Sequence, residues 1–466
     1  MRTPCKSVAS LKEAIAVGGI VPRGSLVGAQ HRVGLGDFLQ GSAIAADVET
    51  LRGRSVLIAS ADPFLTALAL IELDGAARRM ILFPPDLALE HLPYVMRYAE
   101  VDAVVSDGSF LTGASLGTAT HSICRPTLVA AKRLHGERLA TEWILLTSGT
   151  TGRPKMVLHT LASLAGAIDA SPSPTPVIWG TFYDIRRYGG LQIFLRAVLT
   201  HSSLVMAGPG EPAAGYLQRA GEAGITHISG TPSHWRRALM CPEAECIAPR
   251  YVRLSGEIAD QAILNSLRSF YPNAAISHAF ATTEAGVAFD VRDELSGFPV
   301  GTLADAPGVE MKVVDGTLRI RSGRTAKCYL GENPPVLKDA EGFVDTGDAL
   351  DLRDGRYYFQ GRRDGVINVG GLKIHPEEVE AVINRHPRVR LALVKSKKNP
   401  ITGSLVVADV LLEDFSVPDA EDAGELQRTL KQFCRESLAP HKVPTAIRFV
   451  PSLAFSASGK LVRSHG

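Results

Sequence analysis

The chain has 466 residues, of which 45% are hydrophobic and 21% are charged, and this composition excludes a disordered protein. Its 50 basic and 48 acidic residues leave a net charge of +2 without a basic tract, which argues against nucleic acid or an anionic membrane as a partner. A chain of this length exceeds one compact core, so we expect at least two domains.

The cysteines and the apolar runs indicate where such a chain resides. The six cysteines have no repeated spacing that would suit a zinc site or a disulfide framework, so we expect reduced thiols. The apolar run at residues 14–19 is too short for a membrane span and has no cleavage site after it. The run at residues 56–73 is interrupted by Asp62-Pro63. We therefore expect a cytoplasmic protein with no membrane span.

Residues 1 to 140 alternate short apolar runs with segments that suit helices. This pattern is typical of an α/β sheet that carries helices on both faces. The segment contains no cluster of catalytic side chains, so we expect it to be scaffold. The expected strands are 55–59, 80–83 and 103–106, and the expected helices are 63–73 and 87–98.

A polar segment follows at residues 145–155, which read Leu-Leu-Thr-Ser-Gly-Thr-Thr-Gly-Arg-Pro-Lys. Its glycines let backbone N–H groups approach an anion and its hydroxyls add further donors, which favours binding of an oligophosphate. The alternative is a polar surface turn between two strands. The segment is not a Walker-type loop, because no Gly-Lys-Ser/Thr triplet opens a helix after it.

The α/β alternation continues beyond this segment and then changes to a β pattern. We expect helices at 191–199 and 216–223, strands at 203–206, 227–229 and 251–254, and a strand near residue 276 that ends in a polar turn at 280–284. From about Gly297 the apolar residues alternate over short segments, which predicts antiparallel strands of a small β unit. These strands are expected at 309–313 and 317–321.

A domain boundary is predicted at residues 362–365. Residues 1–361 would form the large region, and residues 366–466 would form a small α+β lobe. A helix at 376–385 begins with proline and acidic residues, as helix starts prefer. The other elements expected in this lobe are a helix at 423–437 and strands at 391–394, 405–411 and 447–449. Taken alone, Lys460 reads as a solvated lysine of the chain end.

Six motifs, in this order, resemble those of the adenylate-forming superfamily, which contains acyl-CoA synthetases, luciferases and peptide-synthetase adenylation domains. The resemblance implies an acid-thiol ligase that uses ATP and Mg²⁺ to convert a carboxylic acid to an acyl-adenylate, releases pyrophosphate and passes the acyl group to coenzyme A. Adenylation supplies the leaving group that a carboxylate lacks. The motifs are residues 148–155, 280–284, 346–348, 361–364, 370–371 and 458–460.

The resemblance implies which residues bind the nucleotide. Hydroxyls, glycines and a lysine of the first motif would hold the β- and γ-phosphates, and Phe280 would be an aromatic shelf for adenine. Asp348 is suited to the ribose hydroxyls because hydrogen bonds to a charged group are strong. The residues assigned to ATP or AMP are Thr147, Ser148, Gly149, Thr150, Thr151, Gly152, Lys155, Gly256, Glu257, Phe280, Ala281, Thr282, Asp348 and Arg362.

Three residues are assigned to the reacting groups by the same resemblance. Lys460 would bridge the attacking carboxylate and the α-phosphate and would counter the charge that grows there. Thr283 would contact the α-phosphate. Glu284 would ligate Mg²⁺, which as a hard cation prefers oxygen ligands. These three are the expected catalytic residues.

The C-terminal lobe of such enzymes rotates between two half-reactions, and three residues match that movement. Asp364 corresponds to the hinge. Gly370 and Gly371 would let the pantetheine arm of coenzyme A pass close to the backbone. Lys373 either contacts phosphate or forms a surface ion pair.

The chain departs from the superfamily pattern at the adenine turn and near the expected acyl pocket. Ala281 replaces a glycine of the adenine turn, and residues 183–188 lack the histidine that often lies beside the acyl pocket. Arg186 in that segment either pairs with a second carboxylate of the substrate or pairs with Asp184, and we favour the second interpretation. The shorter N-terminal region leaves monomer and homodimer open. The acyl-pocket candidates are Tyr188, Gly190, Trp235 and Ala288.

Two alternatives stand beside a carboxylate–coenzyme A ligase. The enzyme could adenylate an acid and load a carrier-protein phosphopantetheine or an amine instead of coenzyme A. The chain could also be a catalytically silent nucleotide-binding protein. The presence of Lys460, Glu284 and Asp348 together argues against a silent protein, because a sensor needs only the contacts to ATP. The motifs leave the acid open.

Overall fold

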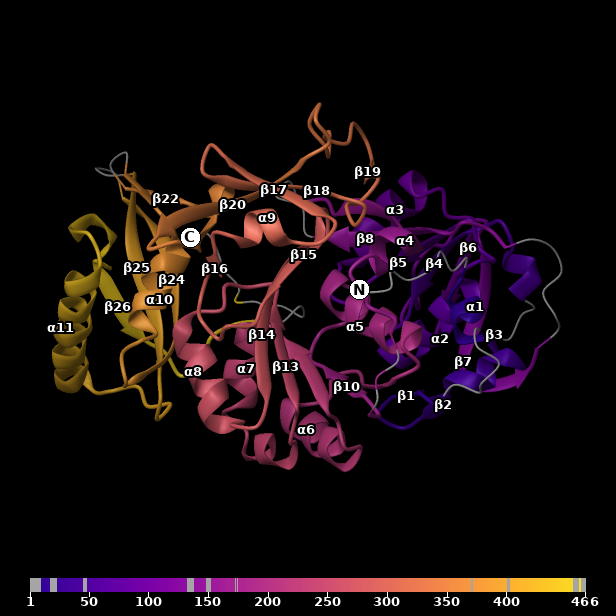
Figure 1. The fold of residues 1–466 in the computed structure, drawn as a ribbon, viewed down its shortest axis with the longest axis horizontal. Coiled ribbons are helices and arrows are strands. Elements are labelled where there is room, and N and C mark those ends of the chain that lie inside the picture. Colours follow the sequence, from indigo (N-terminus) through magenta and orange to yellow (C-terminus); the bar gives the residue numbers. More distant parts are fainter. Residues whose placement is uncertain are drawn as a thin grey trace.

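The computed structural model describes residues 10–16, 23–44, 48–131, 138–147, 152–171, 173, 175–369, 372–399, 403–455 and 461. These residues form a large region with two eight-stranded sheets and one five-stranded sheet, followed by a smaller C-terminal lobe (Figure 1). This arrangement confirms the predicted α/β architecture with its small β unit and its α+β lobe. No helix within these ranges has the length and apolar character needed to cross a membrane.

The first eight-stranded sheet contains the N-terminal strands, and helices α2 (Pro63–Leu73) and α3 (Leu92–Tyr98) cover its opposite faces. Residues 56 and 58 of β4 pack in the cluster of α2, whereas residues 57 and 59 pack in that of α3, as the two-residue period of a strand requires. In spatial order the strands are β19 (Cys328–Leu330), β9 (Lys155–Thr160), β8 (Glu142–Thr147), β5 (Arg79–Leu82), β4 (Ser55–Ala59), β6 (Ala103–Ser106), β7 (Thr120–Ala130) and β3 (Gly41–Ile44).

The second eight-stranded sheet is parallel except at its two ends. Helices α6 (Ala213–Glu222), α7 (Pro232–Ala238) and α8 (Gln261–Phe270) pack on one face of it (Figure 1). In spatial order its strands are β15 (Gly286–Val291), β14 (Ala275–Thr282), β13 (Tyr251–Ser255), β12 (His227–Gly230), β10 (Ile178–Thr181), β11 (Ser203–Met206), β1 (Ser25–Val27) and β2 (Arg32–Gly34).

Helix α5 (Tyr188–Leu199) connects the two sheets. Its apolar residues share one buried cluster with α2, with the first sheet and with β10 and β11 of the second sheet. The short helices α1 (Leu11–Ala16) and α4 (Leu161–Ala165) contribute to the same cluster. The largest core of the molecule therefore lies between the sheets, and it fixes their relative position.

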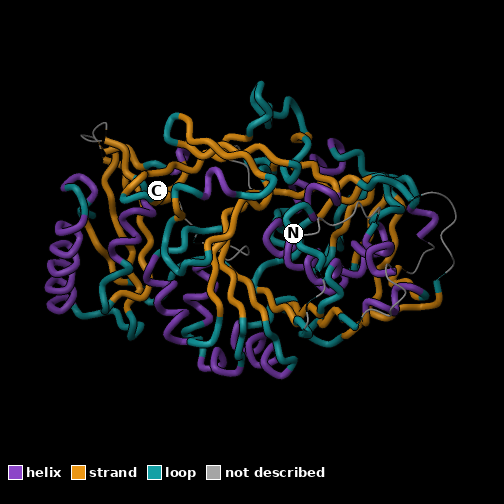
Figure 2. The backbone as a smooth tube through the Cα atoms, in the orientation of Figure 1, coloured by secondary structure: helices purple, strands orange, loops and turns teal. Residues whose placement is uncertain are grey.

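The small β unit and the C-terminal lobe have cores of their own. The β unit contains β16 (Phe298–Pro299), β21 (Arg356–Arg362), β20 (Val344–Arg353), β18 (Thr317–Ser322) and β17 (Val309–Val314), with α9 (Thr302–Asp305) beside β17. The buried cluster of the lobe contains only residues from Ile367 onward. Figure 2 shows helix α11 at the outer side of the lobe, farthest from the large region. The lobe consists of β22 (Ile367–Val369), β23 (Leu372–Ile374), α10 (Pro376–Ile383), β24 (Val389–Asn399), β25 (Gly403–Leu412), α11 (Ala420–Ser437) and β26 (Ala446–Phe449).

Most elements expected from the sequence are present, and the differences lie mainly at their ends. The predicted helix 87–98 begins as a 3₁₀ turn at Leu89–His91, and only α3 is α-helical. Helix α11 starts three residues early because the Asp419 carboxylate accepts hydrogen bonds from the amides of Glu421 and Asp422. Strand β7 is not predicted, because its mostly exposed residues lack an apolar pattern.

The hairpin of β14 and β15 brings the predicted adenine turn to the junction of the sheets. Its turn is closed by the Ala285 amide, which donates to the Thr282 hydroxyl at 2.9 Å. The Ala326 amide donates to the carbonyl oxygen of Glu284 at 2.8 Å and so anchors the turn from outside the hairpin. Gly286 has φ +80°, and a Cβ there would lie 2.6 Å from the carbonyl oxygen of Arg324. This turn thus requires glycine at position 286.

Gly286→Ala is expected to destabilise the protein more than Gly316→Ala. Both residues have positive φ, and leaving that region or straining it costs about 1–3 kcal/mol. Only position 286 adds a clash with backbone, because a Cβ at Gly316 would meet nothing within 4 Å. Urea unfolding followed by fluorescence measures both variants, and equal losses of stability would contradict the close approach at position 286.

Candidate functional site

A cavity of about 450 Å³ lies where the β14–β15 turn meets β9, β19 and the small β unit. It combines residues from four of the six sequence motifs, which are far apart in the chain. Five of its residues were predicted as site residues, namely Lys155, Thr282, Glu284, Arg362 and Asp364. The complete lining is Lys155, Thr282, Glu284, Tyr329, Asp345, Thr346, Gly347, Arg362, Arg363 and Asp364.

Tyr329 connects the cation and the carboxylate on one side of this cavity. Its hydroxyl donates to Glu284 Oε1 at 3.1 Å, and the Lys155 ammonium lies 5.7 Å from the centre of its ring. Burial and the Glu284 charge raise the pKa of Tyr329, so the hydroxyl keeps its proton and remains a donor. The sequence analysis missed Tyr329 because β19 has only three residues and no motif of its own.

Asp348 and Arg362 face each other across the β20–β21 pair, in direct register. Arg362 Nε also donates to Asp364 Oδ1 at 3.0 Å. Burial alone would lower the pKa of Arg362, but Asp364, Asp348 and Glu284 raise it. The predicted ribose residues and the predicted metal ligand are therefore close neighbours, with the guanidinium among three carboxylates.

The local conformation of residues 346–348 follows from one buried threonine and one glycine. The Thr346 hydroxyl donates to the carbonyl oxygen of Leu318 at 2.9 Å and accepts from the Asp348 amide at 3.2 Å. Gly347 has φ +71°, which turns the chain between them. The β20 strand thus presents Asp348 at a defined position beside the cavity.

His159 is a second residue that the sequence analysis missed. Its side chain is 0% exposed, with Nε2 at 2.7 Å from the carbonyl oxygen of Thr283 and Nδ1 at 2.9 Å from the Ser163 hydroxyl. Burial lowers the pKa of His159 to about 4, so the ring is neutral at pH 7. Because a carbonyl only accepts, Nε2 carries the proton and donates to Thr283. The only sequence signal is a histidine inside the apolar strand β9.

Two residues assigned to adenine have structural partners. The Glu257 carboxylate accepts from the amide and the hydroxyl of Ser233 at 2.9 and 3.1 Å, at the start of α7. The Phe280 ring stacks on Phe359, with centroids 4.8 Å apart and planes 9° apart, and on Phe289 at 5.8 Å. Its role as a shelf for adenine stays a prediction, as do the roles of Gly256, Ala281 and Thr147.

The acyl-pocket candidates lie on α5, α7 and β15. Tyr188 and Gly190 lie on α5, and a Cβ at Gly190 would be 2.2 Å from the carbonyl oxygen of Asp184, which explains the glycine by close packing. Trp235 is a fully buried residue of α7, and Ala288 of β15 is buried where the second sheet meets the small β unit. None of the four lines either described cavity, so their role in an acyl pocket stays a prediction.

Arg186 has the structural role that we favoured. Its Nε lies 2.7 Å from Asp184 Oδ1, and its Nη1 donates to the carbonyl oxygens of Ser60 and Ala61. The side chain is buried, and its Nε and Nη1 are both engaged with groups of the protein. The exposed Lys373, by contrast, has no ion pair among the residues that the structure describes.

Several predicted residues lie outside the described residues, so their roles stay predictions. They are Ser148, Gly149, Thr150 and Thr151 of the phosphate segment, Gly370 and Gly371 of the pantetheine segment, and Lys460. Of the same segments, Gly152 is described and has φ +83° with open space around it.

Comparisons with known proteins identify a family for the chain. The model of the AMP-binding enzyme family matches residues 77–330, and that of the AMP-binding enzyme C-terminal domain matches residues 378–460. The 2-succinylbenzoate–CoA ligase of Salmonella typhimurium is 28% identical over 429 residues, which are 89% of this chain and 87% of that protein. The mitochondrial acyl-coenzyme A synthetase ACSM5 of Rattus norvegicus is 27% identical over 69% of this chain, and this chain spans 60% of its length.

A solved structure extends the likeness to the fold of the whole chain. The amide bond synthetase McbA from Marinactinospora thermotolerans superposes with a TM-score of 0.76, over 97% of both chains and at 18% identity. At this identity the match indicates a shared fold and carries nothing about the acceptor.

The stability of the protein is expected to fall between pH 6.5 and pH 4, in part through His159. In this window the unfolded chain binds a proton at the imidazole, with its ordinary pKa of 6.5, whereas the folded chain, with a pKa of about 4, does not. The free energy of unfolding therefore decreases as the pH falls. Each unit of pKa difference contributes about 1.4 kcal/mol.

His159→Gln should reduce this pH dependence, because glutamine can still donate to Thr283 but does not titrate. Urea unfolding at several pH values measures the slope for the variant and for the wild type. His121→Gln, which changes an exposed histidine on β7, is the control and should keep the wild-type slope. An unchanged slope in His159→Gln would contradict a buried neutral ring.

Proposed function

The chain belongs to the AMP-binding enzyme family, and from this membership we propose that it adenylates a carboxylic acid and transfers the acyl group to coenzyme A. In the first step a carboxylate oxygen of the acid bonds to the α-phosphorus of ATP, the bond to the β-phosphate breaks, and pyrophosphate leaves. In the second step the thiolate of coenzyme A attacks the acyl carbon and AMP leaves. The observation that supports this most is the meeting of Lys155, Glu284 and Arg362 in one cavity.

The charges of the cavity suit a nucleotide. Lys155 of β9 and Arg362 of β21 supply two cations that could bind phosphate oxygens. Asp348, opposite Arg362, supplies the acceptor that the two ribose hydroxyls need. Hydrogen bonds to such a charged group contribute about 1.5–3 kcal/mol each. We assign the β- and γ-phosphates to the segment from Thr147 to Lys155.

The donor set also fits Mg²⁺ when ATP is bound. Glu284 offers a carboxylate at the cavity wall, held in place by the Tyr329 hydroxyl. No group of three or more His, Cys, Asp or Glu side chains that could hold a metal by itself occurs among the described residues. Mg²⁺ usually takes one or two carboxylates, phosphate oxygens and water, so Glu284 alone is an adequate protein ligand. When bound, the ion would neutralise phosphate charge.

The position of the adenine turn supports a role for Thr283 in the first step. His159 holds the carbonyl oxygen of Thr283, which fixes the backbone from which the hydroxyl projects. We assign this hydroxyl to the α-phosphate. Lys460 would bridge the attacking carboxylate and the α-phosphate, where a fixed cation lowers the barrier because negative charge grows during attack.

The C-terminal lobe contacts the large region at two points that a rotation would break. Arg390 Nη2 donates to the carbonyl oxygen of Arg236 at 3.1 Å, and the Arg237 guanidinium lies 4.8 Å from the centre of the Phe455 ring. The turn Arg363–Gly365 lies between the separate cores of the two parts. We propose Asp364 as the hinge, residues 366–466 as the moving lobe, and Gly370 and Gly371 as the pantetheine passage.

The purified protein is expected to release pyrophosphate from ATP and Mg²⁺ when a suitable acid is present, and to form a thioester when coenzyme A is added. A panel of short, medium, aryl and dicarboxylic acids, with pyrophosphate and thioester measured separately, tests both steps. Pyrophosphate without thioester would move the acceptor to a carrier-protein phosphopantetheine or an amine. No pyrophosphate with any acid would leave the silent nucleotide-binding protein as the remaining alternative.

Assays of the two half-reactions should separate the residue roles. Lys460→Ala is expected to abolish adenylation while it spares thioester formation from a supplied acyl-adenylate. Glu284→Gln should also slow adenylation, and it alone should raise the Mg²⁺ concentration that gives half the maximal rate. Asp364→Pro should impair one half-reaction selectively. Equal losses in both half-reactions for Lys460→Ala, or an unchanged Mg²⁺ requirement for Glu284→Gln, would refute these assignments.

A further inference from the structure

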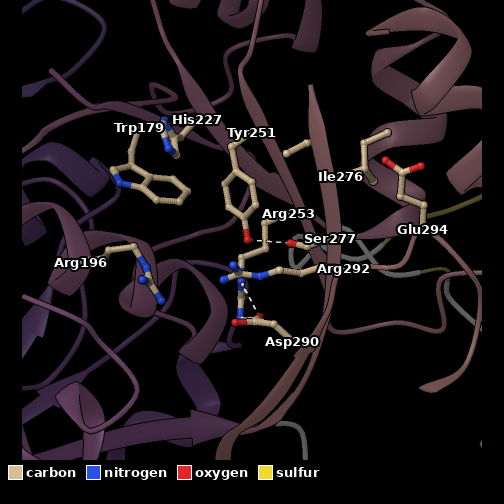
Figure 3. A pocket seen from close by; sticks show the side chains of 11 residues that line it. Trp179, Arg196, His227, Tyr251, Arg253, Ile276, Ser277, Asp290, Arg292 and Glu294 are labelled. Atoms are coloured by element: carbon tan, nitrogen blue, oxygen red, sulfur yellow. Dashed lines mark hydrogen bonds and ion pairs between the residues drawn. The ribbon is translucent and has the colours of Figure 1, made fainter. Parts of the chain in front are cut away.

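A second cavity, of about 370 Å³, lies at the opposite end of the second eight-stranded sheet (Figure 3). It is lined by three arginines, two carboxylates and a wall of aromatic rings. None of these residues belongs to the six motifs. The lining consists of Trp179, Arg196, His227, Tyr251, Arg253, Ala275, Ile276, Ser277, Asp290, Arg292 and Glu294.

The strand register places this cavity relative to the reaction site. Trp179, His227, Tyr251 and Ala275 are in direct register near the amino ends of β10, β12, β13 and β14. The first cavity, where we propose that the reaction occurs, lies beyond the carboxyl end of β14, at the turn that precedes Gly286. Asp290 is four positions after Gly286 on β15, which is about 13 Å along the strand. An extended acid of moderate length spans this distance.

The cavity has more guanidinium groups than carboxylates to pair with them. Arg253 Nη2 forms an ion pair with Asp290 Oδ1 at 2.7 Å, and Glu294 forms an ion pair with Arg268 outside the lining. Arg196 and Arg292 have no ion pair among the residues that the structure describes. Asp290, which is already paired with Arg253, is thus the carboxylate that partly balances all three guanidinium charges.

Arg196 is the arginine best suited to bind a ligand, because its side chain packs on Trp179 but lacks hydrogen-bond partners in the described part of the chain. Its guanidinium lies 5.9 Å from the centre of the Trp179 ring, and in Figure 3 it points into the cavity toward Asp290. Its Nε is buried without a hydrogen-bond partner. Its Nη1 and Nη2 have no hydrogen bond among the described residues, so an acceptor in the cavity could pair with them. Burial lowers the pKa of Arg196, with further lowering by Arg253 and Arg292 that Asp290 opposes.

The remaining walls suit the carbon part of an organic acid. The Trp179 and His227 rings are 4.9 Å apart, and the His227 and Tyr251 rings are 5.5 Å apart, so they form a continuous row. Burial, Arg250 and Arg196 lower the pKa of His227 to about 4, so this ring is neutral at pH 7. The Tyr251 hydroxyl is engaged with the Ser277 hydroxyl at 2.6 Å. The row is therefore an apolar surface beside the cations.

We propose that this cavity binds a second, distal carboxylate of the acyl substrate, with Arg196 as its principal partner, so that the enzyme prefers dicarboxylic acids. The proposal rests on the function proposed above. From the sequence, Arg186 was the alternative partner for a second carboxylate of the substrate. Its Nε and Nη1 are engaged within the protein, so we assign this role to Arg196 instead. Binding of the carboxylate would satisfy Arg196 and offset the charge of Arg292.

The ratio of kcat/KM for decanedioic acid to that for decanoic acid tests the proposal, because the two differ by one distal carboxylate. The ratio is expected to exceed one for the wild type and to fall about 10- to 100-fold in Arg196→Gln, the loss of one charge-assisted contact. Arg196→Lys, which keeps the charge without the fork, should restore part of it. Arg428→Gln, which changes an exposed arginine on α11, is the control.

Calorimetric titration of the protein with decanedioate and decanoate, without ATP, gives a measurement that does not depend on turnover. Tighter binding of decanedioate that Arg196→Gln removes would support the site even if no acid releases pyrophosphate and the proposed reaction fails. Adenylation of both acids with equal kcat/KM, or a ratio that Arg196→Gln leaves unchanged, would overturn the proposal while the proposed function stands. Equal binding of acetate and decanedioate would also overturn it, because the cavity would then accept any free anion.

Discussion

The hydrogen bond between His159 and the carbonyl oxygen of Thr283 joins the two eight-stranded sheets beside the cavity that contains Lys155, Glu284 and Arg362. His159 belongs to β9 of the first sheet, and Thr283 lies in the β14–β15 turn of the second. Burial keeps the ring neutral, and Nε2 donates because the carbonyl oxygen can only accept. Glu284 follows directly in the chain, so this contact is one of those that set the position of the proposed metal ligand.

Around that contact, backbone interactions carry most of the remaining organisation. The Ala326 amide holds the carbonyl oxygen of Glu284, and β19 then brings Tyr329 to the Glu284 carboxylate. On the other side, the β20–β21 pairing places Asp348 opposite Arg362. Each charged group thus comes from a strand or turn that backbone hydrogen bonds hold in place. This is the rigidity that a site for phosphates needs, because donors and cations must be in place before charge develops.

The second sheet has different chemistry at its two ends. The carboxyl end carries the turn, the mixed charges and the hydroxyls that suit a nucleotide. The amino end carries an excess of arginine beside aromatic rings, about 13 Å away along β15. A single extended substrate with a reacting carboxylate and a distal carboxylate would match both ends. The two proposals thus assign the two ends of one substrate to the two ends of this sheet.

The sequence by itself determined the family, the order of the motifs and much of the secondary structure. Continuous apolar runs such as 55–59 and a capped helix such as 63–73 are local patterns, and the structure has both with the predicted bounds. The spacing of the six motifs likewise depends only on chain order. These features could be predicted because they rest on interactions between near neighbours.

Only the tertiary structure decided which residues support the site. Tyr329 meets Glu284 across 45 positions of the chain, and His159 meets Thr283 across 124, so no local pattern announces either contact. The same holds for Arg196. In the sequence it is one basic residue on an apolar helix, and only the folded structure shows that its Nε is buried without a hydrogen-bond partner. Conversely, Glu257 looked available in the sequence, and packing engages it with Ser233, whereas Arg186 pairs with Asp184 as we favoured. Long-range packing sets which charges are satisfied, and so it decides which remain for a substrate.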